Sequence, residues 1–71
     1  MKELVEIRKK PIKKFNSKGD WVLTAKLYKN NGYWSIHRVV HEHHIDPETI
    51  PSYNWKINVG SEKYVRRLWK K

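Results

Sequence analysis

Three histidines in the middle of this 71-residue sequence share one parity, the spacing that brings side chains to one face of a strand. They are His37, His41 and His43, and the pair His41-x-His43 alone would place two imidazoles side by side. Such a pair can hold zinc when a third ligand completes the site. His44 or Glu42 would point to the other face, and the chain has no cysteine to serve as a ligand. We therefore expect surface or interface histidines, with no metal and no cofactor.

Histidine and lysine together could also cleave RNA by general acid–base chemistry. The string Tyr33-Trp34-Ser35-x-x-Arg38, followed by residues 41–44, is similar to a stretch of the RelE/YoeB-type ribonuclease toxins. That similarity covers residues 33–44. In those toxins helices precede the sheet, and this chain lacks such helices. The serines have no triad-like setting, and the three glycines form no phosphate-binding loop. We expect a binding protein rather than an enzyme, and a small ribonuclease is the weakest functional alternative.

Positive charge is the strongest signal in the composition. The sequence has 16 Lys and Arg residues against 7 Asp and Glu residues, which gives a net charge of +9. This balance favours nucleic acid, an anionic membrane surface or an acidic protein as partner, although it also serves plain solubility. The charge gathers near the two ends, in Arg8, Lys9, Lys10, Lys13, Lys14 and Lys18 and in Lys63, Arg66, Arg67, Lys70 and Lys71. The first group is either an arm along phosphates or a solvated segment.

A β-hairpin around Asn31-Gly32 is the clearest element that would position these groups. This dipeptide is a strong hairpin signal because both positions tolerate a positive φ. Apolar residues alternate with others on both sides of it, at Trp21, Leu23, Ala25 and Leu27 and again at Trp34, Ile36 and Val40. A two-residue turn brings the two apolar sets to one face. The predicted pairs are Leu27 with Ile36, Ala25 with Arg38 and Leu23 with Val40.

The other face of this hairpin would display basic and aromatic side chains, namely Lys26, Tyr28, Tyr33, His37, Val39, His41 and, from a later strand, Lys56. Such a face suits single-stranded nucleic acid, since rings stack on bases and lysines neutralise phosphates. An equally good interpretation makes Val22, Tyr28, Tyr33 and Val39 a dimer interface, because a bare apolar and aromatic face usually meets a partner.

The remaining segments complete an α+β fold. Residues 3–9 are either a short strand with Val5 and Ile7 on one face or a frayed helix that ends before Pro11. Residues 55–59 alternate like a strand. A helix over residues 62–70 has Ser61 as its N-cap and is amphipathic, with one apolar stripe of Tyr64, Val65, Leu68 and Trp69. This helix would cover the sheet face that carries Leu23, Leu27, Ile36, Ile57 and Val59 with Trp21, Trp34 and Trp55.

The predicted architecture is therefore an antiparallel meander of three or four strands with one C-terminal helix packed on one face. We expect a single domain over residues 1–71, with a basic N-terminal segment at 1–20, the sheet at 21–59 and the helix at 61–70. In length, basic character and plan, read from the segments 21–27, 34–40, 55–59 and 62–70 and the Asn31-Gly32 turn, the chain resembles an uncharacterised Bacillus prophage family called YopT. The resemblance implies a phage protein that forms a homodimer, and it implies no site. A domain this small also has a marginal core, which favours self-association.

The functional expectation is a homodimeric accessory protein of a prophage that binds DNA or RNA through basic surfaces. The alternative is a module that binds an acidic protein. No segment is apolar and long enough to span a membrane, and no signal peptide begins the chain, so we expect a cytoplasmic protein. The candidate nucleic-acid-binding residues are Lys9, Lys10, Lys13, Lys14, Lys26, Tyr28, Tyr33, Arg66, Arg67 and Lys70.

Overall fold

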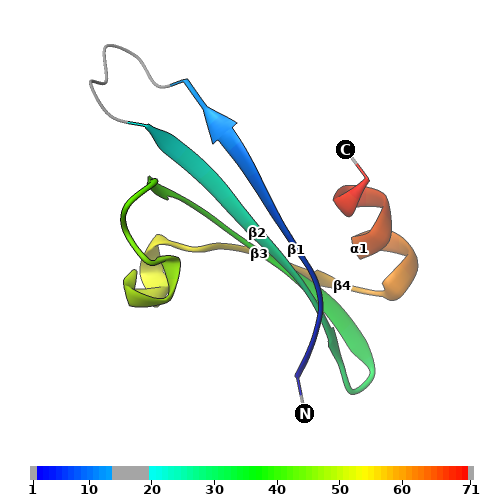
Figure 1. Cartoon of the computed structure of the whole chain (residues 1–71). Coiled ribbons are helices and arrows are strands. Elements are labelled where there is room, and N and C mark those ends of the chain that lie inside the picture. Colours follow the sequence, from blue (N-terminus) through cyan, green and yellow to red (C-terminus); the bar gives the residue numbers. More distant parts are fainter. Residues whose placement is uncertain (1, 14–19, 71) are drawn as a thin grey trace.

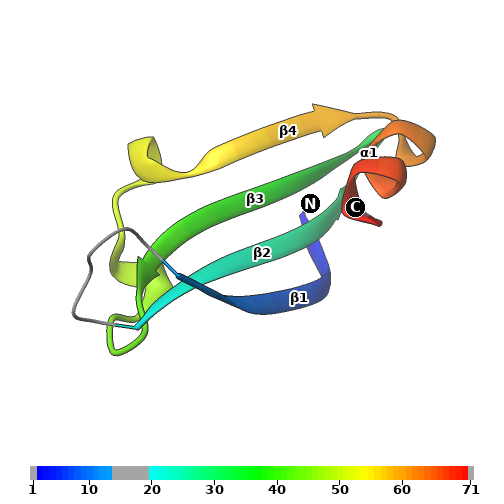
Figure 2. The ribbon, with the colours of Figure 1, turned by 90° about the horizontal axis from the view of Figure 1, so that it is seen from above.

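A four-stranded antiparallel sheet and one helix make up the fold (Figures 1 and 2). The computed structural model describes residues 2–13 and 20–70. The strands follow one another in the order β1-β2-β3-β4, with the bounds β1 Glu3–Ile12, β2 Trp21–Asn30, β3 Tyr33–Glu42 and β4 Lys56–Gly60. Two 3-10 turns, η1 Pro47–Thr49 and η2 Ser52–Asn54, lie between β3 and β4, and the helix α1 Glu62–Trp69 follows β4. The predicted α+β meander with a C-terminal helix is confirmed.

The hairpin of β2 and β3 has the predicted register. Its pairs include Leu27 with Ile36, Ala25 with Arg38 and Leu23 with Val40. Gly32 has a φ of 90°, the left-handed conformation that this turn requires and that glycine adopts without strain. The local turn chemistry thus fixes which side chains of β2 and β3 share a face.

Strand β1 is longer than the sequence indicates, and the helical alternative for residues 3–9 is wrong. It pairs with β2 along Glu3–Ile12, with a register shift between Leu4 and Glu6. The sheet therefore begins at Glu3 instead of residue 21, and Lys9 and Lys10 lie within a strand rather than in a free arm. Because side chains alternate along a strand, Lys9 and Lys10 point to opposite faces of the sheet.

The predicted face of the last strand is wrong. Ile57 pairs with His37 and Val59 with Ser35, so both apolar side chains lie on the face away from the helix. They are 48% and 55% exposed. A tight turn fixes the register of a hairpin, whereas residues 43–55 join β3 to β4 through two 3-10 turns, and a connection of that length leaves the parity of the next strand open.

Helix α1 packs on one end of the sheet, and we call the sheet face that it covers the helix face. The Ser61 hydroxyl accepts a hydrogen bond from the Tyr64 backbone N–H and caps the helix. Tyr64, predicted for the apolar stripe, is 47% exposed and lies against Gly60, where a Cβ would come within 2.6 Å of its ring. The core under the helix consists of Ala25, Leu27, Trp34, Ile36, Val65 and Trp69, with Leu68 packed beside it. Its packing confirms the prediction that Trp34 and the helix meet.

The segment between β3 and β4 lies on the opposite side of the sheet from α1 (Figure 1). We call the face beneath it the connection face. Val22, Thr24 and Val39 are buried there, and none of them is more than 8% exposed. The expectation that this face is bare, with Val22 and Val39 available to a second copy, is therefore wrong. Helix α1 has eight residues, and no helical segment in the described ranges has the length and apolar character of a membrane span.

Candidate anion-binding trough

One row of residues across the helix face brings cations from three strands together. Arg8 of β1 pairs with Ala25 of β2, Ala25 pairs with Arg38 of β3, and Arg38 pairs with Lys56 of β4. Directly opposed residues lie on the same face of a sheet. The row thus holds the guanidinium groups of two arginines on either side of Ala25, followed by the ammonium group of Lys56. Lys10 lies in the next row, where it pairs with Leu23.

Arg8 is held against the last turn of α1. Its guanidinium carbon lies 4.3 Å from the centroid of the Trp69 ring, and its Nη1 donates a hydrogen bond to the Trp69 carbonyl oxygen. Its Nε donates to Glu6 at 2.7 Å, and the Trp69 indole donates to the same carboxylate at 3.2 Å. The hydrogen bond from Arg8 lowers the pKa of the Glu6 carboxyl below its ordinary value. These contacts fix the guanidinium plane, and within residues 2–13 and 20–70 part of its N–H donors have no acceptor.

Arg38 reaches the same helix end from the other side. Its Nη1 donates to Asn58 Oδ1 at 3.1 Å, and its Nη2 donates to the Leu68 carbonyl oxygen at 3.4 Å. The last carbonyls of a helix carry partial negative charge, so two arginines beside them stabilise α1. This structural role explains why one edge of each guanidinium group faces the helix end. It does not account for Lys10 and Lys56, which donate to no helix carbonyl oxygen in the part of the chain that the structure describes.

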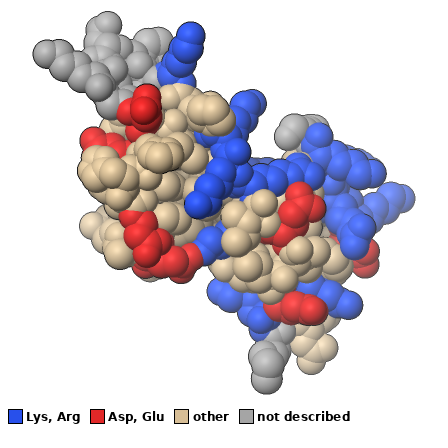
Figure 3. Space-filling model, in the orientation of Figure 1, with Lys and Arg blue, Asp and Glu red and all other residues tan. Residues whose placement is uncertain are grey.

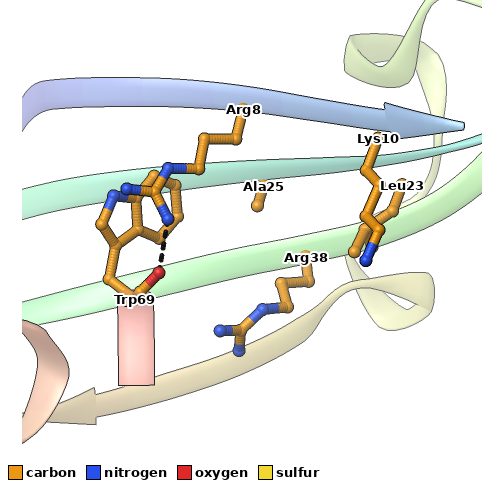
Figure 4. Close-up of a pocket in the computed structure, with 6 residues that line it drawn as sticks. All are labelled: Arg8, Lys10, Leu23, Ala25, Arg38 and Trp69. Atoms are coloured by element: carbon orange, nitrogen blue, oxygen red, sulfur yellow. Dashed lines mark hydrogen bonds between the residues drawn. The ribbon is translucent and has the colours of Figure 1, made fainter. Parts of the chain in front are cut away.

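A hollow lies between the two arginines, above Ala25 (Figure 4). Its volume is about 100 Å³, and Arg8, Lys10, Leu23, Ala25, Arg38 and Trp69 line it. A second depression of about 310 Å³ shares Leu23 and Arg38 with it and continues along Val40 to Lys56. We call the two together the cationic trough. Figure 3 shows Lys and Arg side chains gathered along the indentation that separates the far end of the sheet from the helix.

The trough carries positive charge that the described residues do not neutralise. Of its cations only Arg8 pairs with a carboxylate, and the ranges 2–13 and 20–70 contain no ion pair to Lys10, Arg38 or Lys56. Like charges directly opposed across a sheet are unfavourable, as for Arg38 and Lys56. An anion in the trough would remove that repulsion and bind to donors that are already in place.

Comparisons with protein-family models, with curated proteins and with solved structures give no match. The resemblance to the prophage family therefore stays a prediction from the sequence. The trough and the distribution of charge are the features that bear on function.

The basic residues predicted to bind nucleic acid fall into separate places. Lys10 lines the trough, Lys9 lies on the connection face, Lys13 follows the end of β1, and Lys14 lies outside the described residues. Arg67 on α1 and Lys70, the residue after α1, are exposed. Arg66 pairs with Glu62 at 2.9 Å and lies 4.8 Å from the centroid of the Trp34 ring.

The other three candidates belong to the connection face. Lys26 is 8% exposed, forms an ion pair with Glu48, and lies 5.5 Å from the centroid of the Trp55 ring. Tyr28 meets the His37 ring edge-on, with 4.7 Å between centroids. Tyr33 is 47% exposed beside the hairpin turn. The structure thus uses Lys26 inside the fold and leaves Tyr33 accessible.

The histidines have individual partners. His41 is buried, its Nδ1 donates to the Glu42 carbonyl oxygen at 2.9 Å, and its Nε2 lies 2.6 Å from the Thr24 hydroxyl. Burial, with the charges of Lys2 and Lys26, lowers the pKa of His37. His44 Nε2 lies 3.4 Å from Glu42 Oε2, and the His43 backbone N–H donates to the Asp20 backbone carbonyl oxygen at 2.8 Å. Within the described residues no three His, Asp or Glu side chains stand together as a metal site would require.

Sequence reasoning missed three members of the trough, namely Arg8, Arg38 and Lys56. In the predicted hairpin register, Arg38 is a charged residue within the apolar face, opposite Ala25. A charge at such a position needs a structural or functional explanation, so the register itself points to Arg38. The sequence pattern predicts Lys56 on the other face, because it gives β4 the opposite parity. Arg8 joins the row only through the pairing of β1 with β2.

Proposed function

We propose that this protein binds nucleic acid, with the cationic trough as its central contact. The observation that carries the proposal is the row of Arg8, Arg38 and Lys56 across three strands, with Lys10 beside it and few carboxylates to neutralise it. Phosphates are the anions that match several fixed guanidinium donors at once. The net charge of +9 adds long-range attraction to the same class of ligand.

Helix α1 extends this surface. Arg67 is exposed on α1 and Lys70 is exposed just after it, next to Trp69, which lines the trough. A strand of phosphates that leaves the trough would meet these charges next. Each neutralised phosphate releases counterions, so the affinity should fall steeply as salt rises.

The test is a titration of labelled DNA and RNA oligonucleotides of mixed sequence with the full chain at two salt concentrations. We expect binding at low salt that weakens at high salt. The double variant Lys10→Glu with Lys56→Glu should abolish binding of the oligonucleotides. The control, Lys9→Glu with Lys13→Glu, changes the net charge by the same amount at positions outside the trough. Equal losses in both double variants would exclude the trough as the contact. No binding by the unmodified chain at low salt would exclude the function.

A module for an acidic protein is the second candidate. Val40 is 38% exposed beside Arg38 and Lys56, so the second depression offers aliphatic surface as well as charge. That combination fits an acidic segment with apolar side chains. Poly-glutamate in the same titration distinguishes the candidates, since binding to it at salt concentrations that dissociate the oligonucleotides would favour the protein partner.

We also propose a homodimer, through the end of the connection face that the 3-10 turns leave open. Leu4, Ile7, Tyr33, Ile57 and Val59 are each 45–55% exposed. Strands β1 and β4 bring Leu4 and Val59 to this face on either side of the Tyr28–Ser35 pair. Sedimentation of the chain should give a dimer, and Val59→Lys should give a monomer. A monomer at every accessible concentration would contradict the assignment.

A further inference from the structure

We infer that the cationic trough takes single-stranded rather than duplex nucleic acid, with a backbone phosphate seated over Ala25 between Arg8 and Arg38. This inference rests on the proposed nucleic-acid function and narrows it to one class of ligand. The seat is defined by the cross-strand row and by the hollow above its one small residue.

The two guanidinium groups are preorganised for an anion at this point. Arg8 is fixed by the Trp69 ring, the Trp69 carbonyl oxygen and Glu6, and Arg38 is fixed by Asn58 and the Leu68 carbonyl oxygen. In Figure 4 both side chains and Lys10 border the space above Ala25. Donors held in place before binding lose little freedom when a phosphate arrives.

The position of the seat favours a flexible chain. The hollow is a recess of about 100 Å³, and Trp69 at the end of α1 forms one of its walls. Duplex DNA has a persistence length of about 150 base pairs, so its backbone follows the wall formed by Trp69 less readily than a single strand does. A single strand can bend to lower one phosphate between the arginines.

The surroundings of the seat also suit unpaired bases. The guanidinium of Arg8 already covers the Trp69 ring, and its outer side is a planar surface on which an unstacked base can lie. Leu23 and the 38% exposed Val40 provide apolar contact for the next base or sugar. In a duplex the base faces are occupied by their neighbours, so it cannot use these surfaces.

The experiment compares one labelled DNA strand of mixed sequence with the duplex of the same sequence, titrated with the full chain at two salt concentrations. We expect the single strand to bind about tenfold tighter, as one additional stacked base would give. Ala25→Val fills the hollow without a change of charge and should remove this preference. Equal or tighter binding of the duplex by the unmodified chain would overturn the inference while the proposed function stands.

A second pair of variants keeps the test decisive if Ala25→Val disturbs the fold. Lys10 lines the seat and Lys9, its neighbour in β1, points to the opposite face. Lys10→Gln should weaken binding of the single strand and lower the log–log salt slope by about 0.7, the value for one phosphate on a single strand. Lys9→Gln should leave the slope unchanged. Equal slopes for both variants would overturn the seat, and no binding of either probe at low salt would overturn the proposed function itself.

Discussion

On the connection face the ammonium group of Lys26 is buried, with Glu48 and Trp55 against it. On the helix face Arg38 and Lys56 lie side by side, and no carboxylate of the described residues pairs with either. Both faces belong to one sheet and carry strand cations at comparable positions. The segment between β3 and β4 brings a carboxylate to its face, and α1 brings the carbonyl oxygens of its last turn.

The difference shows which charges are neutralised within the folded protein and which remain for a ligand. A carboxylate neutralises an ammonium group fully, so Lys26 serves the folded state and nothing is left for a ligand. A helix end carries about half an elementary charge, which orients two guanidinium groups without neutralising them. The helix face therefore retains positive charge in a fixed geometry, and variants on the two faces should affect different properties.

The largest effect should come from the core beneath the helix. Ile36 is fully buried and Ile57, on the other face, is 48% exposed. Ile36→Ala should lower the free energy of unfolding by about 2–5 kcal/mol, a large share of the stability of a small domain. At protein concentrations where the chain is monomeric, Ile57→Ala should change it by about 0.5 kcal/mol or less. Urea unfolding of both variants measures the contrast, and equal losses would show that the helix does not enclose the main core.

The next effect should separate a structural cation from a ligand-binding one. Glu48→Gln leaves the Lys26 ammonium buried without its carboxylate, which should cost about 1–3 kcal/mol of unfolding free energy. Lys26→Met removes the buried positive charge itself, so it should lower the free energy of unfolding by less than Glu48→Gln does. The matched variant Lys56→Met, on the helix face, should leave stability unchanged and weaken binding of the oligonucleotides. If Lys56→Met destabilised the fold as much as Glu48→Gln, the contrast between the faces would fail.

A smaller effect should distinguish neighbours on α1. Arg66 lies 4.8 Å from the centroid of the Trp34 ring and pairs with Glu62. Arg67 is exposed, and the described residues offer it neither an ion pair nor a ring contact. Arg66→Ala should cost about 0.5–1 kcal/mol of unfolding free energy, and Arg67→Ala should cost nothing measurable. Reversal of both to Glu should abolish nucleic-acid binding. Arg67→Glu is the cleaner of the two reversals, because it changes the ligand surface without loss of a packing contact.

The parts of this molecule that the sequence predicts are those fixed by local chemistry. Asn31-Gly32 sets the turn, the turn sets the register, and the register places Arg38 opposite Ala25. Ser61 and the apolar spacing that follows it set the helix. Each of these interactions lies within a few residues of the signal that encodes it.

The trough could not be predicted because it depends on two longer connections. The pairing of β1 with β2 brings Arg8 to the row, and residues 43–55 decide the parity with which Lys56 enters it. The partner of Lys26, Glu48, also lies in that connection. Composition shows that the chain is basic, and only the tertiary register shows which cations are neutralised and which are not.

The smallest effect concerns His37, which lies on the connection face beside Tyr28 and Trp55. Burial first, and then the charges of Lys2 and Lys26, lower its pKa in the folded protein. In the unfolded chain a histidine titrates at about pH 6.5. Just below that pH the unfolded chain therefore binds more protons than the folded protein. Its contribution to stability is present above the unfolded pKa and is lost as pH falls toward the folded pKa. The melting temperature should thus fall as pH is lowered below about 6.5, and His37→Gln should flatten that dependence. His43→Gln, an exposed control, should leave this dependence intact, and an unchanged slope in His37→Gln would show that His37 does not carry it.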